Sequence, residues 1–414
     1  MSQAALKEEF GVFSNPFDTV VEAAPDPLFG VKQQYLADPR PNKVDLSVGV
    51  YYAESGRLEK MAAALKAETL LHEKLAAGKL VDYLGMPGTE SFSTRVKELL
   101  IHGSSWVDPE AVVTVQSLGG TGALRLAADF LSRHLNTKTI LVSAPTWPVH
   151  ISLFERAGFK ISQYPYYDLN SHRLLPSEMQ ACLRAAAPQT VVLMHAVCHN
   201  PSGLDLDLQG WTEVAQICEE RGLVPLLDMA YQGLGLGLEA DLESIKAFSR
   251  RGLPFLVAQS FSKNFSMYNR RVGALHLFCR SAKHASTVLS QLKTDIRNNY
   301  SNPPMDGAAI VDLILSTPEL RALWMKELNE MRLRLDRNRN QLAAKLADAG
   351  HQERFAHFSK THGMFVMTGL SGVQVTRLKD NDGMYVVGNG RLCLSALNLQ
   401  NIDAVAAAIS KVLA

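Results

Sequence analysis

The chain has 414 residues, of which 47% are hydrophobic and 20% are charged. Its 42 lysines and arginines nearly balance 41 aspartates and glutamates, for a net charge of +1, which gives no reason to expect binding to nucleic acid or to a membrane surface. The length favours two lobes or domains over one compact core.

The cysteines and the N-terminal residues indicate the cellular compartment. The five cysteines are odd in number and scattered without a CxxC pair, which argues against a disulfide framework or a metal site and favours a reducing compartment. The first residues, MSQAALKEEFGVF, lack the pattern of a secretory signal, and no apolar stretch has the length of a membrane span. We therefore expect a cytoplasmic protein with no metal, nucleic-acid or membrane partner.

Short apolar runs alternate with amphipathic stretches in the middle of the chain. The composition predicts strands at 112–115, 139–143, 190–196, 223–228 and 254–260, and helices such as 122–134 and 211–221. Continuous apolar strands separated by helices are typical of a parallel sheet buried on both faces. We therefore predict an α/β fold with a mostly parallel central sheet flanked by helices.

The pattern becomes helical after residue 306, and 319–348 is predicted to be one long helix that joins two lobes. Shorter strand-like pieces follow at 364–367, 384–387 and 391–396, and Asn401 is the cap candidate of a terminal helix. We predict a large domain over 59–330, a smaller α/β domain from 13–58 and 331–414, and an N-terminal arm over 1–12.

Polar residues follow three of the predicted strands. Asn200, Asp228 and Lys263 lie at these ends, where functional residues gather in open α/β sheets. A nucleophilic lysine needs a depressed pKa, and Arg270 and Arg271 follow Lys263. A carboxylate at the position of Asp228 can hold a cationic ring nitrogen. The ordinary alternatives are a surface lysine, a helix cap and a turn.

Two further motifs indicate an anion site. The run SLGGTGAL (117–124) places glycines at the start of a predicted helix, where backbone N–H groups can bind phosphate, although it lacks the full G-x-G-x-x-G spacing. The hydroxyls of Ser260 and Ser262 precede Arg271. Either motif alone is also compatible with an ordinary loop.

The motifs become specific when they are taken in chain order. The glycine turn, Trp147 in APTWPVH, HNPSG, LLDMAYQG and SFSKNFSMYNRRVG lie within one predicted α/β region. The set resembles the aspartate and aromatic-amino-acid aminotransferases, which are class I of the fold-type-I enzymes that use pyridoxal 5′-phosphate (PLP). The resemblance extends from DLSVGVYY through VDYLGMPGTESF to RLCLSALN.

The resemblance implies a role for each matching residue. Lys263 matches the Schiff-base lysine and proton shuttle, and Asp228, with His150 behind it, matches the partner of the ring nitrogen. Tyr231 and Asn200 match the hydrogen-bond partners of the phenolic oxygen. The aromatic residue stacked on the ring is Trp147, and the phosphate site comprises Gly120, Thr121, Ser260, Arg271 and, from a second subunit, Tyr83.

Two arginines match the substrate-binding residues of the family. Arg391 matches the arginine that binds the α-carboxylate, with help from Gly49 and Asn200, while Trp147 borders the substrate. Arg297 matches the arginine that reaches across a dimer to a distal carboxylate. The resemblance thus implies a homodimer with shared active sites, and ping-pong transfer of an amino group between an aromatic or dicarboxylic L-amino acid and 2-oxoglutarate.

Several residues depart from the family pattern. Ser266 occupies a position where most aspartate-specific members have Gly, and FSMY is closer to the aromatic group. Arg270 replaces a usual Glu and either adds positive charge to the phosphate site or faces solvent. Glu59 and Lys60 differ from relatives near the substrate entrance. These departures favour an aromatic or broad-specificity enzyme.

Three other functions compete with this interpretation. The same scaffold can carry out β-elimination or racemisation, since the residues around PLP decide the reaction; the full pair of carboxylate-binding arginines favours transamination. A nicotinamide dehydrogenase built on GGTGAL lacks the acidic residue for a ribose contact. A non-catalytic relative would have no need to retain Lys263, Asp228, Arg271 and Arg391 together.

Overall fold

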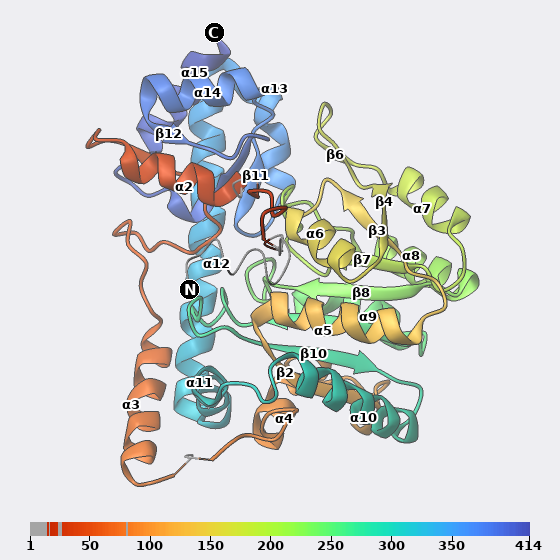
Figure 1. The fold of residues 1–414 in the computed structure, drawn as a ribbon. Helices are drawn as coiled ribbons and strands as arrows, with labels where there is room; N and C mark the ends of the chain where they lie inside the picture. Colours follow the sequence, from red (N-terminus) through yellow and green to blue (C-terminus); the bar gives the residue numbers. More distant parts are fainter. Residues whose placement is uncertain (1–14, 16, 24–26, 80–81) are drawn as a thin grey trace, which may run out of the picture.

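The computed structural model describes residues 15, 17–23, 27–79 and 82–414. Its centre is a seven-stranded sheet with the strand order β2-β10-β9-β8-β7-β3-β4 (Figure 1). These strands are β2 (Val112–Leu118), β3 (Thr139–Ala144), β4 (Lys160–Pro165), β7 (Val191–His195), β8 (Val224–Met229), β9 (Phe255–Ser260) and β10 (Val272–Phe278). β10 runs antiparallel to both of its neighbours, β2 and β9, and the other pairs of adjacent strands are parallel, so the predicted mostly parallel α/β sheet is confirmed.

The sheet contains two strands that the sequence did not predict. All seven residues of β10 are buried. Its antiparallel direction arises because the short segment 261–271 returns the chain without a crossover helix. The edge strand β4, KISQYP, is largely polar and only partly buried, so it lacks the continuous apolar pattern of the inner strands.

Helices cover both faces of the sheet, and alternate strand residues belong to two apolar cores. Val191 and Leu193 pack in one core, while Val192 and Met194 pack in the other. The surrounding helices are α3 (Ala62–Ala76), α4 (Glu90–Ile101), α5 (Gly119–His134), α6 (Pro148–Arg156), α7 (Pro176–Ala185), α8 (Leu208–Arg221), α9 (Glu243–Arg250), α10 (Ala282–Asn299) and α11 (Met305–Ser316). The double coverage explains why the strand segments are apolar throughout.

A long helix, α12 (Pro318–Leu346), confirms the helix predicted over 319–348. It contacts α3 and α11 in one part of its length and α15 (Ile402–Leu413) in another (Figure 1). The chain beyond α12 also includes α13 (Gln352–Phe355), β11 (Phe365–Met367), α14 (Gly372–Asp382), β12 (Met384–Tyr385) and β13 (Arg391–Cys393). The two-domain division at 59–330 stays a prediction, and the predicted arm 1–12 lies outside the described residues.

N-terminal elements pack onto this C-terminal part. The helix α2 (Pro27–Ala37) precedes β1 (Val44–Asp45), which pairs in parallel with β12, while β11 pairs antiparallel with β13. A small hairpin, β5 (Tyr167–Asp168) and β6 (Arg173–Leu174), projects from the main sheet region. Within the described residues, no helix is both long enough and apolar enough to cross a membrane.

Asn401 occupies the predicted position before α15, but its side chain does not cap the helix. Its Oδ1 accepts from the backbone N–H of Asn398 at 2.9 Å, and its Nδ2 donates to the carbonyl of Ala396 at 2.9 Å. The side chain therefore fixes the turn that leads into α15.

Candidate active site

A cavity of about 330 Å³ lies beyond the carboxyl ends of β7, β8 and β9. It brings together eleven of the fourteen site residues predicted from the sequence: Gly49, Gly120, Thr121, Trp147, Asn200, Asp228, Tyr231, Ser260, Lys263, Arg271 and Arg391. Parallel strands end at the same edge of a sheet, so residues distant in sequence meet there.

Lys263 lies in the turn that follows β9 and lines the cavity. Burial lowers the pKa of its amine from 10.5 to about 8, and the positive charges of Arg271 and Arg391 act in the same direction, against the opposing effect of Asp228. Its Nζ is 4.7 Å from the centre of the Tyr231 ring. The lowered pKa increases the fraction of neutral amine near physiological pH, which favours its action as a nucleophile or proton acceptor.

Asp228 lies near the end of β8 and is buried. Its Oδ2 accepts a hydrogen bond from His150 Nε2 at 2.9 Å, and His150 Nδ1 contacts the hydroxyl of Thr146 at 2.9 Å. Burial by itself raises the pKa of Asp228, but the hydrogen bond and charge of His150 and the charge of Lys263 outweigh it and leave the pKa below its ordinary value. The cavity therefore contains a fixed negative charge, and His150 lies behind it.

The start of α5 forms a group of hydrogen-bond donors. Gly119 and Gly120 are its first residues, and a Cβ at Gly120 would lie 3.0 Å from the Cβ of Ser260. Arg271 donates to the hydroxyl of Ser262 at 3.2 Å and to the carbonyl of Tyr268 at 3.2 Å. A helix N-terminus, hydroxyls and a guanidinium together are chemically suited to bind an anion such as phosphate.

Arg391, in β13, is a second buried cation. It donates to Asn200 Oδ1 at 2.9 Å and to the carbonyl of Ser47 at 2.7 Å, and its guanidinium lies 4.2 Å from the centre of the Phe365 ring. Burial lowers its pKa, and no carboxylate contributes to the shift. Within the described part of the chain its Nε has no hydrogen-bond partner. A buried cation without a counter-ion is chemically suited to bind a carboxylate.

Three predicted residues do not line the cavity. His150 lies behind Asp228, as expected. The side chains of Tyr83 and Arg297 are exposed, and the guanidinium of Arg297 contacts the hydroxyl of Ser301. Both residues were expected to act at the active site of a second subunit.

The structure adds cavity residues that the sequence reasoning missed, among them His195, Tyr268 and Phe365. His195 ends β7 and pairs in register with Asp228, so its position at a strand end could have revealed it. Burial lowers its pKa to about 3, and in the described structure its Nδ1 lacks a partner. Phe365 reaches the cavity from β11, and no local sequence signal indicated that contact.

The structure shows the contacts of the residues that depart from the family pattern. Arg270 forms ion pairs with Glu68 at 3.0 Å and with Asp306 at 3.5 Å, and it does not line the cavity. Lys60 pairs with the same Glu68 at 2.8 Å, so two of the departures share one carboxylate. Ser266 has a φ of 53°, a conformation that suits glycine.

The donor and acceptor groups of this cavity fit PLP. The α5 terminus with Arg271 suits the phosphate, Lys263 supplies an amine, and Asp228 supplies an anion for a ring nitrogen. A side chain at position 120 would crowd Ser260, so a glycine keeps the phosphate end of the cavity open. His150, His195 and Asp228 also place potential metal-ligand atoms within 4.8 Å of one another, but His150 Nε2 and Asp228 already share a hydrogen bond.

Comparisons with known proteins agree with this geometry. The family model described as aminotransferase class I and II matches residues 41–409. An aspartate aminotransferase of Pseudomonas aeruginosa is 43% identical over 397 residues, covering 95% of this chain and 99% of that protein. An aromatic-amino-acid aminotransferase of Escherichia coli is 39% identical over 398 residues, covering 96% and 100%. The crystal structure of an aromatic-amino-acid aminotransferase from Burkholderia pseudomallei, covalently bound to PLP, has a TM-score of 0.94 at 43% identity and covers 97% of this chain and 100% of that one.

Proposed function

Because the chain belongs to the class I and II aminotransferases, we propose that it transfers an amino group between an aromatic or dicarboxylic L-amino acid and 2-oxoglutarate. The reaction is a ping-pong transfer that uses PLP. The observation that carries the proposal is the meeting of Lys263, Asp228, Arg271 and Arg391 in one cavity. An amine, a carboxylate and two separate anion sites are the groups that this chemistry needs.

The residues that would hold PLP follow from the donor set. Lys263 would hold it covalently, and Ser260, Arg271 and the Gly120–Thr121 backbone would bind its phosphate. Trp147 lines the same cavity and is proposed as the aromatic residue stacked on the ring. Asp228 would pair with the ring nitrogen, and His150 would orient the carboxylate.

When bound, PLP supplies a cationic ring that withdraws electrons from the bonds of the substrate α-carbon. Lys263 Nζ would take the proton from this carbon and return it elsewhere, a task suited to an amine with a pKa of about 8. Burial raises the pKa of Tyr231, so its hydroxyl keeps its proton and can donate to the phenolic oxygen together with Asn200. Asp228, with its lowered pKa, would keep the ring nitrogen protonated.

Arg391 is the proposed partner of the substrate α-carboxylate. It would bind the two carboxylate oxygens while Asn200 and the carbonyl of Ser47 orient its guanidinium. The backbone N–H of Gly49, which also lines the cavity, would assist. Every α-amino acid substrate would use this site, whatever its side chain.

A homodimer would complete the substrate site. Tyr83 and Arg297 are exposed in the single chain, and each is proposed to enter the active site of a second copy, Tyr83 at the phosphate and Arg297 at a distal carboxylate. An arginine at that position would select aspartate, glutamate and their 2-oxo acids. The aromatic side chains of Trp147, Tyr268 and Phe365 in the cavity wall support aromatic substrates as well.

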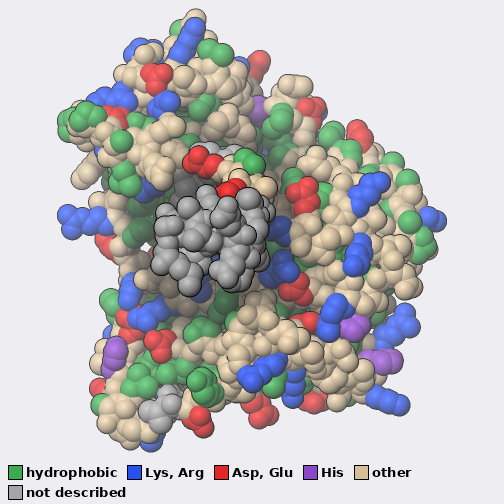
Figure 2. Space-filling view, in the orientation of Figure 1, with side chains coloured by type: hydrophobic (Ala, Val, Ile, Leu, Met, Phe, Trp, Pro, Cys, Tyr) green, Lys and Arg blue, Asp and Glu red, His purple; other side chains and the backbone are tan. Residues whose placement is uncertain are grey.

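We also infer a cytoplasmic location for the enzyme. Its five cysteines are all free of disulfides, which is typical of a reducing compartment. Figure 2 shows basic and acidic side chains interspersed on one face of the molecule. This face therefore gives no reason to propose a nucleic-acid or membrane partner.

Absorption spectroscopy of the purified protein tests the proposed function. PLP attached to Lys263 should give a visible band that bleaches on addition of an amino donor and returns with 2-oxoglutarate, whereas Lys263→Ala should lose both responses. Absence of a band after PLP is supplied would refute the cofactor role of Lys263. If the protein shows this band but releases pyruvate and ammonia without an amino acceptor, it catalyses elimination instead.

The role of Arg297 has a separate test. If it recognises a distal carboxylate, aspartate should have a much higher kcat/KM than alanine, and Arg297→Lys should reduce activity with aspartate more than activity with phenylalanine. Equal kcat/KM values for aspartate and alanine in the wild-type enzyme would contradict this assignment.

A further inference from the structure

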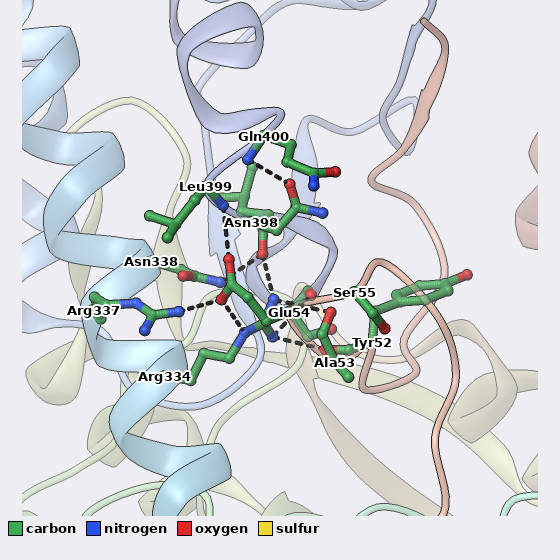
Figure 3. Close-up of polar contacts among 12 residues, drawn as sticks. Tyr52, Ala53, Glu54, Ser55, Arg334, Arg337, Asn338, Asn398, Leu399 and Gln400 are labelled. Atoms are coloured by element: carbon green, nitrogen blue, oxygen red, sulfur yellow. Dashed lines mark hydrogen bonds and ion pairs between the residues drawn. The ribbon is translucent and has the colours of Figure 1, made fainter. Parts of the chain in front are cut away.

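Arg334 is a buried arginine of α12 that lies outside the cavity. It makes five hydrogen bonds, and four of the acceptors are backbone carbonyl oxygens (Figure 3). An arginine has five N–H donors in a rigid, planar arrangement. Four of the five hydrogen bonds of this side chain therefore fix backbone, and the fifth goes to the carboxylate of Glu54.

These acceptors belong to two segments that are distant in sequence. On the N-terminal segment, Arg334 donates to the carbonyls of Tyr52 at 2.7 Å and Ala53 at 3.3 Å. On the C-terminal segment, it donates to the carbonyls of Ser395 at 3.3 Å and Leu397 at 2.6 Å. One guanidinium thus joins residues 52–53 to residues 395–397.

Each segment leads directly to a proposed contact of the substrate α-carboxylate. Gly49 lies three residues before Tyr52, and Arg391 lies four residues before Ser395. Between Arg334 and the cavity, the hydroxyl of Ser395 donates to the carbonyl of Val50 at 2.6 Å. Arg391 donates to the carbonyl of Ser47 at 2.7 Å. The two segments are therefore bonded to each other along their length, from Arg334 to the cavity.

We propose that Arg334 is a positioning residue for substrate binding, because it fixes the segment of Gly49 relative to the segment of Arg391. The proposal rests on the function proposed above, in which these two residues bind the α-carboxylate. Arg334 itself touches neither substrate nor cofactor. Replacement of Arg334 should lower kcat/KM by the same factor for every amino acid, since all of them share the α-carboxylate.

The burial and the partners of Arg334 distinguish it from a neighbouring exposed arginine. Glu54 Oε2 accepts from Arg334 Nε at 3.0 Å and also pairs with Arg337, while its Oε1 accepts from the N–H of Leu399 at 2.8 Å (Figure 3). The side chain of Arg337 is 43% exposed, against 9% for Arg334, and among the described residues its only hydrogen-bond partner is Glu54. Arg337 therefore shares the carboxylate without joining the two backbones, which makes it a matched control.

The test compares Arg334→Lys, Arg334→Met and Arg337→Met as PLP-loaded enzymes. Lysine keeps the charge but has three donors on one nitrogen and cannot satisfy four carbonyls. A misplacement of about 1 Å at an active site can cost roughly a hundredfold, so we expect kcat/KM to fall about tenfold in R334K and more in R334M. The fall should be the same for phenylalanine and aspartate, and R337M should stay within about twofold of the wild type.

Two measurements distinguish positioning from general damage. The dissociation constant of 3-phenylpropionate, a carboxylate without an amino group, should rise about tenfold in R334K. The rate at which hydroxylamine, an amine without a carboxylate, bleaches the cofactor band should stay within about twofold of the wild type, because it does not use the Gly49–Arg391 site. Should R334M fail to fold, R334K decides the question.

The proposal is overturned if R334K binds 3-phenylpropionate as the wild type does, or if hydroxylamine bleaching slows as much as phenylalanine turnover. Either result would make Arg334 a stability residue only. A wild-type enzyme that shows no cofactor band or no response to amino acids would instead refute the proposed function. The two failures are therefore distinguishable.

Discussion

Replacement of Gly119 by alanine tests the proposed phosphate site at the start of α5. Gly119 has a φ of 70°, and an added Cβ would lie 2.7 Å from Nη2 of Arg271. The neighbouring atom is the end of a flexible side chain, so the chain can still fold if the guanidinium moves. The substitution therefore places the damage in the anion site and leaves the core packing intact.

Gly119→Ala should lower both the unfolding free energy of the protein and its affinity for PLP. A left-handed backbone costs an alanine about 1–2 kcal/mol of unfolding free energy relative to glycine. Displacement of Arg271 also weakens its contacts with Ser262 and Tyr268, both at 3.2 Å. A charge-assisted hydrogen bond contributes about 1.5–3 kcal/mol, so loss of one such bond to the phosphate raises the dissociation constant of PLP roughly tenfold to a hundredfold.

Gly103 provides a matched control. It also has a φ of 70°, but an added Cβ would meet nothing within 4 Å. Gly103→Ala should therefore show the same backbone cost in urea unfolding of the cofactor-free protein and no change in PLP affinity, measured by titration of the absorption band. Equal PLP affinities for Gly119→Ala and Gly103→Ala would refute the assignment of the α5 terminus to the phosphate.

Three further changes have expected outcomes. Burial lowers the pKa of Lys263 from 10.5 to about 8, so between these pH values the unfolded cofactor-free chain binds more protons than the folded one. The unfolding free energy of the wild type relative to Lys263→Met should therefore increase as the pH rises from 8 to 10.5. A difference that is constant with pH would contradict this expectation. Trp324 is fully buried and donates its indole N–H to a backbone carbonyl at 2.7 Å. Trp324→Phe should therefore lower the unfolding free energy by about 2–4 kcal/mol in a urea titration. Replacement of the exposed Leu333 by alanine should change the unfolding free energy by less than about 0.5 kcal/mol. Arg270→Ala should leave PLP affinity within about twofold, because its ion pairs lie outside the cavity, whereas Arg271→Ala should weaken it strongly; similar losses for both would mean that Arg270 acts on the phosphate.

The α/β class and most of the cavity residues could be predicted without coordinates. Buried parallel strands are apolar along their whole length, so β2, β3, β7, β8 and β9 were recognisable one at a time. Their carboxyl ends share one edge of the sheet, so the residues that follow them could be assigned to a common site before any contact was known. The family resemblance then supplied the roles proposed for these residues.

The residues that join the cavity from other parts of the chain could be identified only from the packing of distant segments. Phe365 and Tyr268 line it, and Arg270 turns away from it toward Glu68, although nothing in the neighbouring sequence distinguishes these outcomes. The five hydrogen bonds of Arg334 likewise join carbonyls from segments more than 300 residues apart. Strand composition is a local consequence of burial on both faces, whereas the partner of an arginine depends on which distant backbone the packing brings within reach of its N–H groups.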